Sequence, residues 1–302
     1  MTLHRNAIVI LALLAAAAAV PALGSDYWIG FGITALMWIA LTQSWSVFSG
    51  LSGYVSFGHV VFYGLGAYVV VATWDRLPLA ASLPLAALAA AAFALAVGTP
   101  VLRVRGPYFV ILSFGLAELV KFVVIAVEAA AGHASRLILH SLDTVFIFYL
   151  MLALAAAATG LAWTVRASRL GHGLRAIREN EEAAETLGVP AARYKLFALV
   201  LSAAIPGAVG GTMALRATYF EPVQAFDPMV SFSMIAMAVI GGSDDILGPV
   251  VGAAVLVYLS ELLWASAPQL YMVILGALLL TFVLFVPEGL CGRLLARRPR
   301  PA

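Results

Sequence analysis

Charged side chains are scarce in this 302-residue sequence. Only 11% of the residues are Asp, Glu, Lys or Arg, whereas 63% are hydrophobic. A soluble domain carries about 25% charged residues, because its surface needs polar cover. The formal net charge of +2 also gives no indication of nucleic-acid binding. The composition therefore excludes an ordinary soluble domain and predicts an all-α, polytopic membrane protein.

Cysteine and lysine are rarer still. The single cysteine, Cys291, excludes an internal disulfide and a cysteine metal site. The two lysines, Lys121 and Lys195, are followed by Phe122 and Leu196 rather than by Ser or Thr, so the chain has no phosphate-binding loop of its own. Zinc-protease and nucleophile-elbow patterns are also absent. We expect no catalytic residue, cofactor or metal, and hence no enzyme.

Long apolar runs fill most of the chain. A membrane helix needs about 20 mainly apolar residues, and this length predicts eight to ten crossings in one transmembrane domain over residues 1–302. One run, Met229–Ile240, is short and is expected to be broken or re-entrant. The expected spans are Ala7–Leu23, Trp28–Val47, Val55–Thr73, Ala80–Val101, Tyr108–Ala131, Val145–Val165, Leu196–Leu215, Met229–Ile240, Gly248–Trp264 and Leu270–Val286.

The first run has two interpretations. Arg5 followed by the apolar stretch Ile8–Val20 is similar to a cleavable signal peptide. The next long apolar run begins only a few residues later, which favours an uncleaved first helix. Either interpretation leaves the orientation of the remaining spans unchanged.

The positions of the basic residues predict the orientation. Lys and Arg gather on the cytoplasmic side of membrane proteins. With ten spans, thirteen of the 17 basic residues fall on one side, Lys121 lies within a span, and the other side holds Arg76, Arg136 and Arg216. We therefore expect both termini, a loop at residues 166–195 and a basic tail at residues 288–302 to be cytoplasmic.

The loop at residues 166–195 is the longest polar stretch, yet its pattern is helical. Ile177, Ala184 and Leu187 form an apolar stripe among charged residues, Gly188 is placed to end a helix, and Pro190 follows. This predicts a short amphipathic helix on the cytoplasmic face. Its apolar side could be buried against a protein partner or rest on lipid headgroups.

Glu182, Ala183, Ala184 and Gly188 in this loop resemble the Glu-Ala-Ala loop of permease subunits in ATP-binding-cassette importers. Three other segments resemble the LivM-type permease subunit of branched-chain amino acid importers. The motifs occur in the same order as in that family, and the resemblance covers about residues 28–290. These segments are Leu51–His59, Arg103–Phe109 and Gly241–Ala253.

This resemblance implies a permease subunit in the bacterial inner (plasma) membrane. It also implies a second permease subunit in a heterodimer, two ATP-binding subunits and a periplasmic substrate-binding protein. The four residues named above would belong to the helix that docks on the ATPase. Substrates would be branched-chain or related neutral amino acids, with urea or short amides as an alternative.

Glycine-rich interruptions and buried polar residues mark a possible path. Gly53, Tyr54, Ser56 and His59 interrupt an apolar region, and loosened backbone at membrane depth can face a cavity or pack against other helices. We expect His59 to hydrogen-bond within the bundle. Asp244 and Asp245 would cap a helix that begins near Ile246, with a gate or a contact to a neighbouring subunit as the alternative.

Four charged residues lie within the expected spans. Glu118 and Lys121 are three residues apart and are expected to pair, either for packing or as a substrate contact. Glu128 and Glu261 lie near the outer ends of their spans and are expected to be solvated. An ion-gradient-coupled transporter or channel that uses Glu118, Lys121 and His59 remains a second hypothesis for the function.

Overall fold

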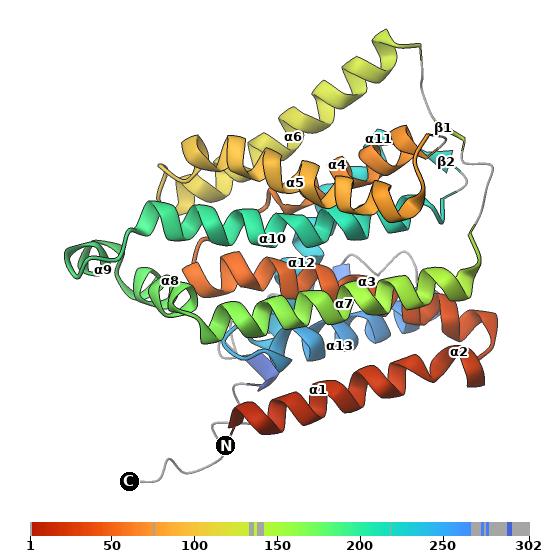
Figure 1. Cartoon of the computed structure of the whole chain (residues 1–302), viewed down its shortest axis with the longest axis horizontal. Coiled ribbons are helices and arrows are strands. Elements are labelled where there is room, and N and C mark those ends of the chain that lie inside the picture. The colour runs from red at the N-terminus through yellow and green to blue at the C-terminus, as the bar shows by residue number, and fades with distance from the viewer. Residues whose placement is uncertain are drawn as a thin grey trace.

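The computed structural model describes residues 2–74, 76–132, 136–137, 142–217, 219–266, 273–274, 276–277 and 289–291. Its helices run side by side in one bundle, and two short helices, α8 and α9, project from one end (Figure 1). We call this the loop end of the bundle. An all-α polytopic membrane fold is confirmed, with a single pairing of two short strands added to it.

The first half of the chain contains six α-helices and a π-helical turn that continues α3. These elements are α1 Thr2–Ala18, α2 Val20–Leu23, α3 Asp26–Trp45, η1 Ser46–Gly50, α4 His59–Thr73, α5 Leu79–Val101 and α6 Pro107–Ala130.

The described part of the second half contains seven α-helices and two strands, each strand of two residues. These elements are β1 Arg136–Leu137, α7 Thr144–Ala167, α8 Arg169–Glu179, α9 Glu181–Thr186, α10 Ala191–Ala214, β2 Tyr219–Phe220, α11 Pro222–Ala225, α12 Pro228–Gly241 and α13 Leu247–Ser266.

Six segments of the described chain are long and apolar enough to cross a membrane, and α4 and α13 contain shorter apolar helices. Three expected spans differ from the structure. The span expected at Ala7–Leu23 is divided between α1, Thr2–Ala18, and α2, Val20–Leu23. The span expected from Val55 is wrong at its start, because the helix begins only at His59. The run at Met229–Ile240 belongs to α12, and the one-turn helix α11 precedes it. The last expected span lies almost entirely outside the described residues.

Helix α10 lies at the centre of the bundle and packs most extensively against α4 and α5 (Figure 1). Glycine makes this approach possible, since small residues let membrane helices pack backbone to backbone. A Cβ atom at Gly66 of α4 would overlap the backbone of Gly207, and one at Gly210 would overlap the carbonyl oxygen of Tyr63. The close packing holds the middle of α4 against the C-terminal half of α10.

The two ends of the bundle carry different structures. At the end opposite α8 and α9, Arg136 pairs with Phe220 and Leu137 with Tyr219 in antiparallel strands (Figure 1). Helix α1 begins at the loop end, where the N-terminus was expected (Figure 1). Most of the expected basic tail at residues 288–302 lies outside the described residues, so the side on which it lies stays a prediction.

Candidate functional site

The polar loop at the loop end folds into two helices, so the expectation of one helix is wrong. Ser168 caps α8 by accepting a hydrogen bond from the Gly171 backbone N–H. Asn180 has an extended backbone and caps α9 by accepting from the Ala183 N–H at 3.0 Å. Asparagine readily forms such local caps, which compete with a continuous helix. Gly188 has a positive φ of 87°, which confirms it as the residue that ends the helix.

The apolar side of these helices is buried by the protein's own bundle. Ile177 and Ala184 pack with Leu174 in a core cluster that also contains residues of η1, α5 and α10. The expectation that a partner or the headgroups would bury this side is therefore wrong for these residues. Leu187 departs from the expected stripe altogether, because it is 85% exposed.

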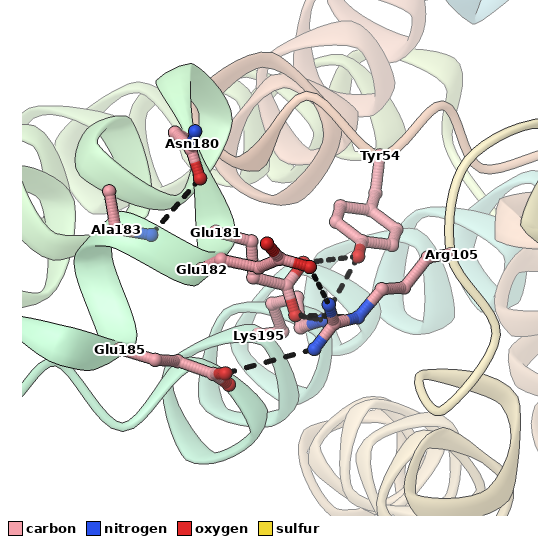
Figure 2. A network of polar contacts seen from close by, with 8 residues as sticks. All are labelled: Tyr54, Arg105, Asn180, Glu181, Glu182, Ala183, Glu185 and Lys195. Carbon is pink, nitrogen blue, oxygen red and sulfur yellow. Dashed lines mark hydrogen bonds and ion pairs between the residues drawn. The ribbon is translucent and has the colours of Figure 1, made fainter.

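A buried lysine connects α9 to the rest of the bundle. Lys195, in the first turn of α10, is only 2% exposed, and its Nζ donates to Glu181 Oε1 at 2.7 Å. The same Nζ donates to the Tyr54 hydroxyl oxygen at 3.1 Å, and that hydroxyl donates to Glu181 Oε2 (Figure 2). Three residues from distant parts of the sequence thus form a closed set of hydrogen bonds, which we call the Tyr54–Glu181–Lys195 triad.

The protonation states of the triad follow from these contacts. Burial alone would raise the pKa of Glu181, but the hydrogen bonds from Lys195 and Tyr54 and the charges of Lys195 and Arg105 leave that pKa below its ordinary value. Burial and the hydrogen bond to Glu181 raise the pKa of Tyr54. Glu181 is therefore an anion at neutral pH, and the Tyr54 phenol keeps the proton that it donates.

Arg105 adds an outer layer of weaker contacts. Its guanidinium lies 3.4 Å from a Glu181 oxygen and 3.7 Å from oxygens of Glu182 and Glu185 (Figure 2). The Arg105 side chain is about half exposed, and exposed ion pairs of this kind contribute about 0–1 kcal/mol each. The buried triad therefore dominates the attachment of α9.

A second attachment lies on α8. The Arg178 guanidinium donates to the Gly50 carbonyl oxygen at 3.0 Å and pairs with an Asp244 carboxylate oxygen at 2.5 Å. Gly53 has a positive φ of 75°, and a Cβ atom there would lie 2.9 Å from Arg178 Cγ. Helix α8 thus contacts Gly50, the last residue of η1, and Gly53, which lies in the segment that separates η1 from α4.

The turn before α13 is held at the same end. Arg166 donates to the carbonyl oxygens of Ser243 and Asp244 at 2.7 and 2.9 Å. Asp245 Oδ1 accepts from the adjacent Ile246 N–H at 2.7 Å, but a helix cap accepts from an N–H of the first helical turn and α13 begins only at Leu247, so capping by Asp245 stays a prediction. Asp244 instead pairs with Arg178, so the two aspartates have different roles.

The segment between η1 and α4, residues 51–58, leaves regular helix at Gly53 and re-enters it only at His59; we call it the break. Trp45 Nε1 donates to the Ser56 carbonyl oxygen at 2.9 Å, and the Phe57 N–H donates to Ser113 Oγ at 3.1 Å. Ser231 Oγ donates to the Phe57 carbonyl oxygen at 2.7 Å. Side chains of α3, α6 and α12 therefore satisfy the exposed backbone groups, as membrane-embedded irregular backbone requires.

Ser56, near the end of the break, and His59, the first residue of α4, are the buried residues that were expected near the path. His59 is confirmed as hydrogen-bonded within the bundle: its ring nitrogens lie 3.1 Å from Ser56 Oγ and 3.2 Å from Ser202 Oγ. Ser56 and His59 are both buried, which favours helix packing over exposure to an open cavity. Gly53, Tyr54, Ser56 and His59 are brought together along the break, whereas Glu118 lies on α6.

The charged residues of the spans differ in their environments. Glu118 and Lys121 are confirmed as a pair, with 2.5 Å between Lys121 Nζ and a Glu118 oxygen. Glu261 is exposed and accepts a hydrogen bond from the Tyr27 hydroxyl at 2.7 Å. The expectation that Glu128 is solvated is wrong, because Glu128 is buried near the end of α6.

Sequence reasoning missed Glu181, Lys195, Arg105 and Arg178 as parts of this site. One signal was available for Lys195: it is one of only two lysines and directly precedes a long apolar run. Glu181 gave no such signal, because it is one acidic residue among several in the loop and only the tertiary structure selects it.

Comparisons with known proteins found similar transport permeases. Residues 27–283 match the family described as branched-chain amino acid transport system / permease component. The chain is 29% identical to the high-affinity branched-chain amino acid transport system permease proteins LivM of Salmonella typhimurium and Escherichia coli, over 93% of this chain and 74% of each relative.

A shorter similarity involves a relative with a different name. Over 97 residues, or 32% of this chain and 30% of the relative, the chain is 30% identical to a probable branched-chain amino acid transport permease protein LivH of Methanocaldococcus jannaschii. No solved structure matches the chain.

Proposed function

This chain belongs to the family of branched-chain amino acid transport permease components, and from that premise we propose that it is the membrane-spanning subunit of an ATP-driven importer. The substrate is a branched-chain or related neutral amino acid. Energy comes from separate ATP-binding subunits, because the sequence lacks a phosphate-binding loop.

One observation carries the proposal: α9 is anchored on one side and open on the other. Glu181 and Ala184 hold it to the bundle, whereas the Glu182 side chain and Leu187 are exposed. The helix projects beyond the ends of the long helices (Figure 1). An anchored helix with an exposed leucine at its tip is suited to insert into a groove of a partner protein. The docking surface is formed by the exposed residues Glu182, Ala183, Leu187 and Gly188, whereas Ala184, also expected there, packs inward against the bundle.

The two attachments provide a route from that surface into the membrane. Movement of α9 acts on Tyr54 through Glu181 and Lys195, and movement of α8 acts on Gly50 and Gly53 through Arg178. Both sets of contacts end on or beside the break. The break continues through Ser56 to His59, where Ser202 of α10 lies. ATPase motion thus changes the packing of α4 against α10 and so opens or closes the path.

The partners follow from the family and from the charge pattern. We place the protein in the bacterial inner membrane with both termini and the loop end in the cytoplasm, because most Lys and Arg residues fall on that side. A second permease subunit completes a heterodimer, and the partial similarity to a LivH relative supports related permeases of two kinds. Two ATP-binding subunits and a periplasmic binding protein complete the importer.

Co-purification of the ATP-binding subunits tests the docking surface. Leu187→Asp places a charge on an exposed tip and leaves the internal contacts of the bundle in place, so the variant should insert normally but lose the ATP-binding subunits. Val223→Asp is the matched control, because Val223 is also an exposed apolar residue but lies on α11, toward the opposite end of the bundle. Equal recovery of the ATP-binding subunits with both variants would refute docking through α9.

A further inference from the structure

Helix α6 carries a stripe of three residues that take no part in the contacts of α8 and α9 with the bundle. Phe114, Glu118 and Lys121 are spaced by four and three residues, which places them on one side of the helix. Of the six candidate spans, α6 has the smallest buried share. The stripe lies at the border between the face of α6 that packs on the bundle and the face that is exposed.

The ion pair lies close to the middle of its helix. At 1.5 Å per residue, Glu118 and Lys121 are about 16 and 21 Å from the first residue of a helix about 36 Å long. Their side chains are 27% and 15% exposed. Charged groups at the centre of a bilayer cost about 2.5–3.5 kcal/mol each on insertion scales, so they face protein or a water-filled path rather than lipid.

An aromatic cluster lies one helical turn from the pair. The rings of Phe114 and Phe57 have centroids 6.2 Å apart, and those of Phe57 and Phe232 lie 4.8 Å apart. The three residues come from α6, the break and α12, and both Phe114 and Phe232 are exposed. The break therefore contributes an aromatic residue to a partly open surface next to a mid-membrane ion pair.

We propose that this surface, formed by Phe57, Phe114, Phe232, Glu118 and Lys121, binds a neutral amino acid with an apolar side chain in its zwitterionic form. Lys121 binds the substrate carboxylate, Glu118 binds the substrate ammonium group, and the aromatic cluster receives the side chain. We call it the zwitterion face. The inference rests on the proposed function and adds the place where the substrate binds within the membrane.

The dimensions and the chemistry of the surface fit this ligand. Four residues, or about 6 Å along the helix axis, separate Phe114 from Glu118, which is comparable to the distance from the charged groups of leucine to the end of its side chain. A zwitterion offers one anion and one cation, so each member of the pair gains an opposite charge and the total charge of the site stays at zero. The surface also adjoins the break, so coupling motion would reach the bound substrate.

Ligand binding to the purified complex, without the periplasmic binding protein, tests the proposal. The probes are L-leucine, L-isoleucine and L-valine, leucinol, which lacks the carboxylate, and 4-methylpentanoate, which lacks the ammonium group. The wild-type complex should bind the amino acids at least roughly tenfold more tightly than either analogue, since each loses a charge-assisted hydrogen bond.

The variants assign each charge to its partner. In Lys121→Met the advantage of leucine over leucinol should disappear, and in Glu118→Gln the advantage over 4-methylpentanoate should disappear. Because each single change strands a charge, the double variant Glu118→Gln/Lys121→Met serves as the stable neutral form, and it should lose the tight binding of leucine. Leu119→Ala, an exposed residue on another side of α6, is the control and should bind all the probes like the wild type.

Three results would overturn the inference. Binding of the three amino acids by the double variant as tight as by the wild type, or weak binding of all three by both, shows that the pair is only structural. An equal loss for every probe in both single variants leads to the same conclusion. The ATP-binding subunits are scored separately in each purified sample, so failure of the docking proposal is distinguishable from failure of the zwitterion face.

Discussion

Lys195 Nζ and Glu181 Oε1 lie 2.7 Å apart and join the first turn of α10 to the first turn of α9, with Lys195 almost completely buried. A buried ammonium group needs a partner, since an isolated buried charge is very costly. This pair therefore determines where α9 sits on the bundle, and the Tyr54 hydroxyl extends the contact to the break (Figure 2).

Removing the lysine should destabilise the loop end more than removing the whole pair. Lys195→Met removes the buried charged partner of the Glu181 carboxylate, leaving it only the Tyr54 hydroxyl and the half-exposed Arg105, and should lower the free energy of unfolding by about 3 kcal/mol, whereas Glu181→Gln/Lys195→Met should cost clearly less. Unfolding of the detergent-solubilised protein measures both. If the loss in the double variant equals the sum of the losses in Lys195→Met and Glu181→Gln, the two side chains contribute independently and the pair is refuted.

Tyr54→Phe should separate docking from transport. The change removes the hydroxyl that bridges Glu181 and Lys195 but keeps the ring, so the ATP-binding subunits should still co-purify while the uptake rate falls roughly 5- to 20-fold. Tyr149→Phe is the matched control, because the Tyr149 hydroxyl makes a single long hydrogen bond, 3.3 Å, to the Ala18 carbonyl oxygen. Normal uptake by the Tyr54 variant would contradict transmission through the triad.

Two glycine substitutions should have effects of opposite sign. Gly53→Ala forces a side chain into a positive φ of 75° and close to Arg178, so it should destabilise the protein by about 1–2 kcal/mol or more. Gly115→Ala lies within α6, where a Cβ atom meets nothing within 4 Å, and should stabilise the helix by about 0.5–1 kcal/mol. Thermal unfolding midpoints of both variants, compared with the wild type, measure the difference.

The Glu181 interaction should persist in mild acid. Because the folded protein holds the pKa of Glu181 below the ordinary value of about 4.3, its contribution is complete at higher pH and is lost as the pH falls through the folded-state pKa. The stability difference between the wild type and Glu181→Gln should therefore be constant from pH 7 to pH 5 and shrink at lower pH. A difference that already shrinks between pH 7 and pH 5 would contradict the shift.

The apolar runs predicted most spans well. Helices α5, α6, α7 and α10 lie within a few residues of their expected bounds, because about 20 consecutive apolar residues suffice to identify a membrane helix. The expected span at Val55–Thr73 was wrong for a physical reason. Its first residues are apolar enough for a helix, but side chains of Trp45, Ser113 and Ser231 satisfy the backbone groups of Ser56 and Phe57 outside a helix.

The sequence predicted that the loop is helical, but it did not predict where the loop divides into two helices or that Leu187 is exposed. The helix-ending role of Gly188 followed from its position after a helical pattern and is confirmed by its positive φ. The division at Asn180 was not expected, although asparagine favours helix caps, because the stripe from Ile177 to Leu187 was interpreted as one continuous helix. The apolar stripe identified Ile177 and Ala184 correctly as buried residues but included Leu187, which is exposed.

The sequence alone determined that the protein is a helical membrane protein and which family it resembles, because hydropathy and motif spacing are local properties of the chain. The tertiary structure alone decided which polar residues meet. Tyr54 lies 127 residues from Glu181 and 141 residues from Lys195, and no local pattern selects these partners. The cost of burying an unpaired charge selects them, and that cost exists only once α9, α10 and the break are packed together.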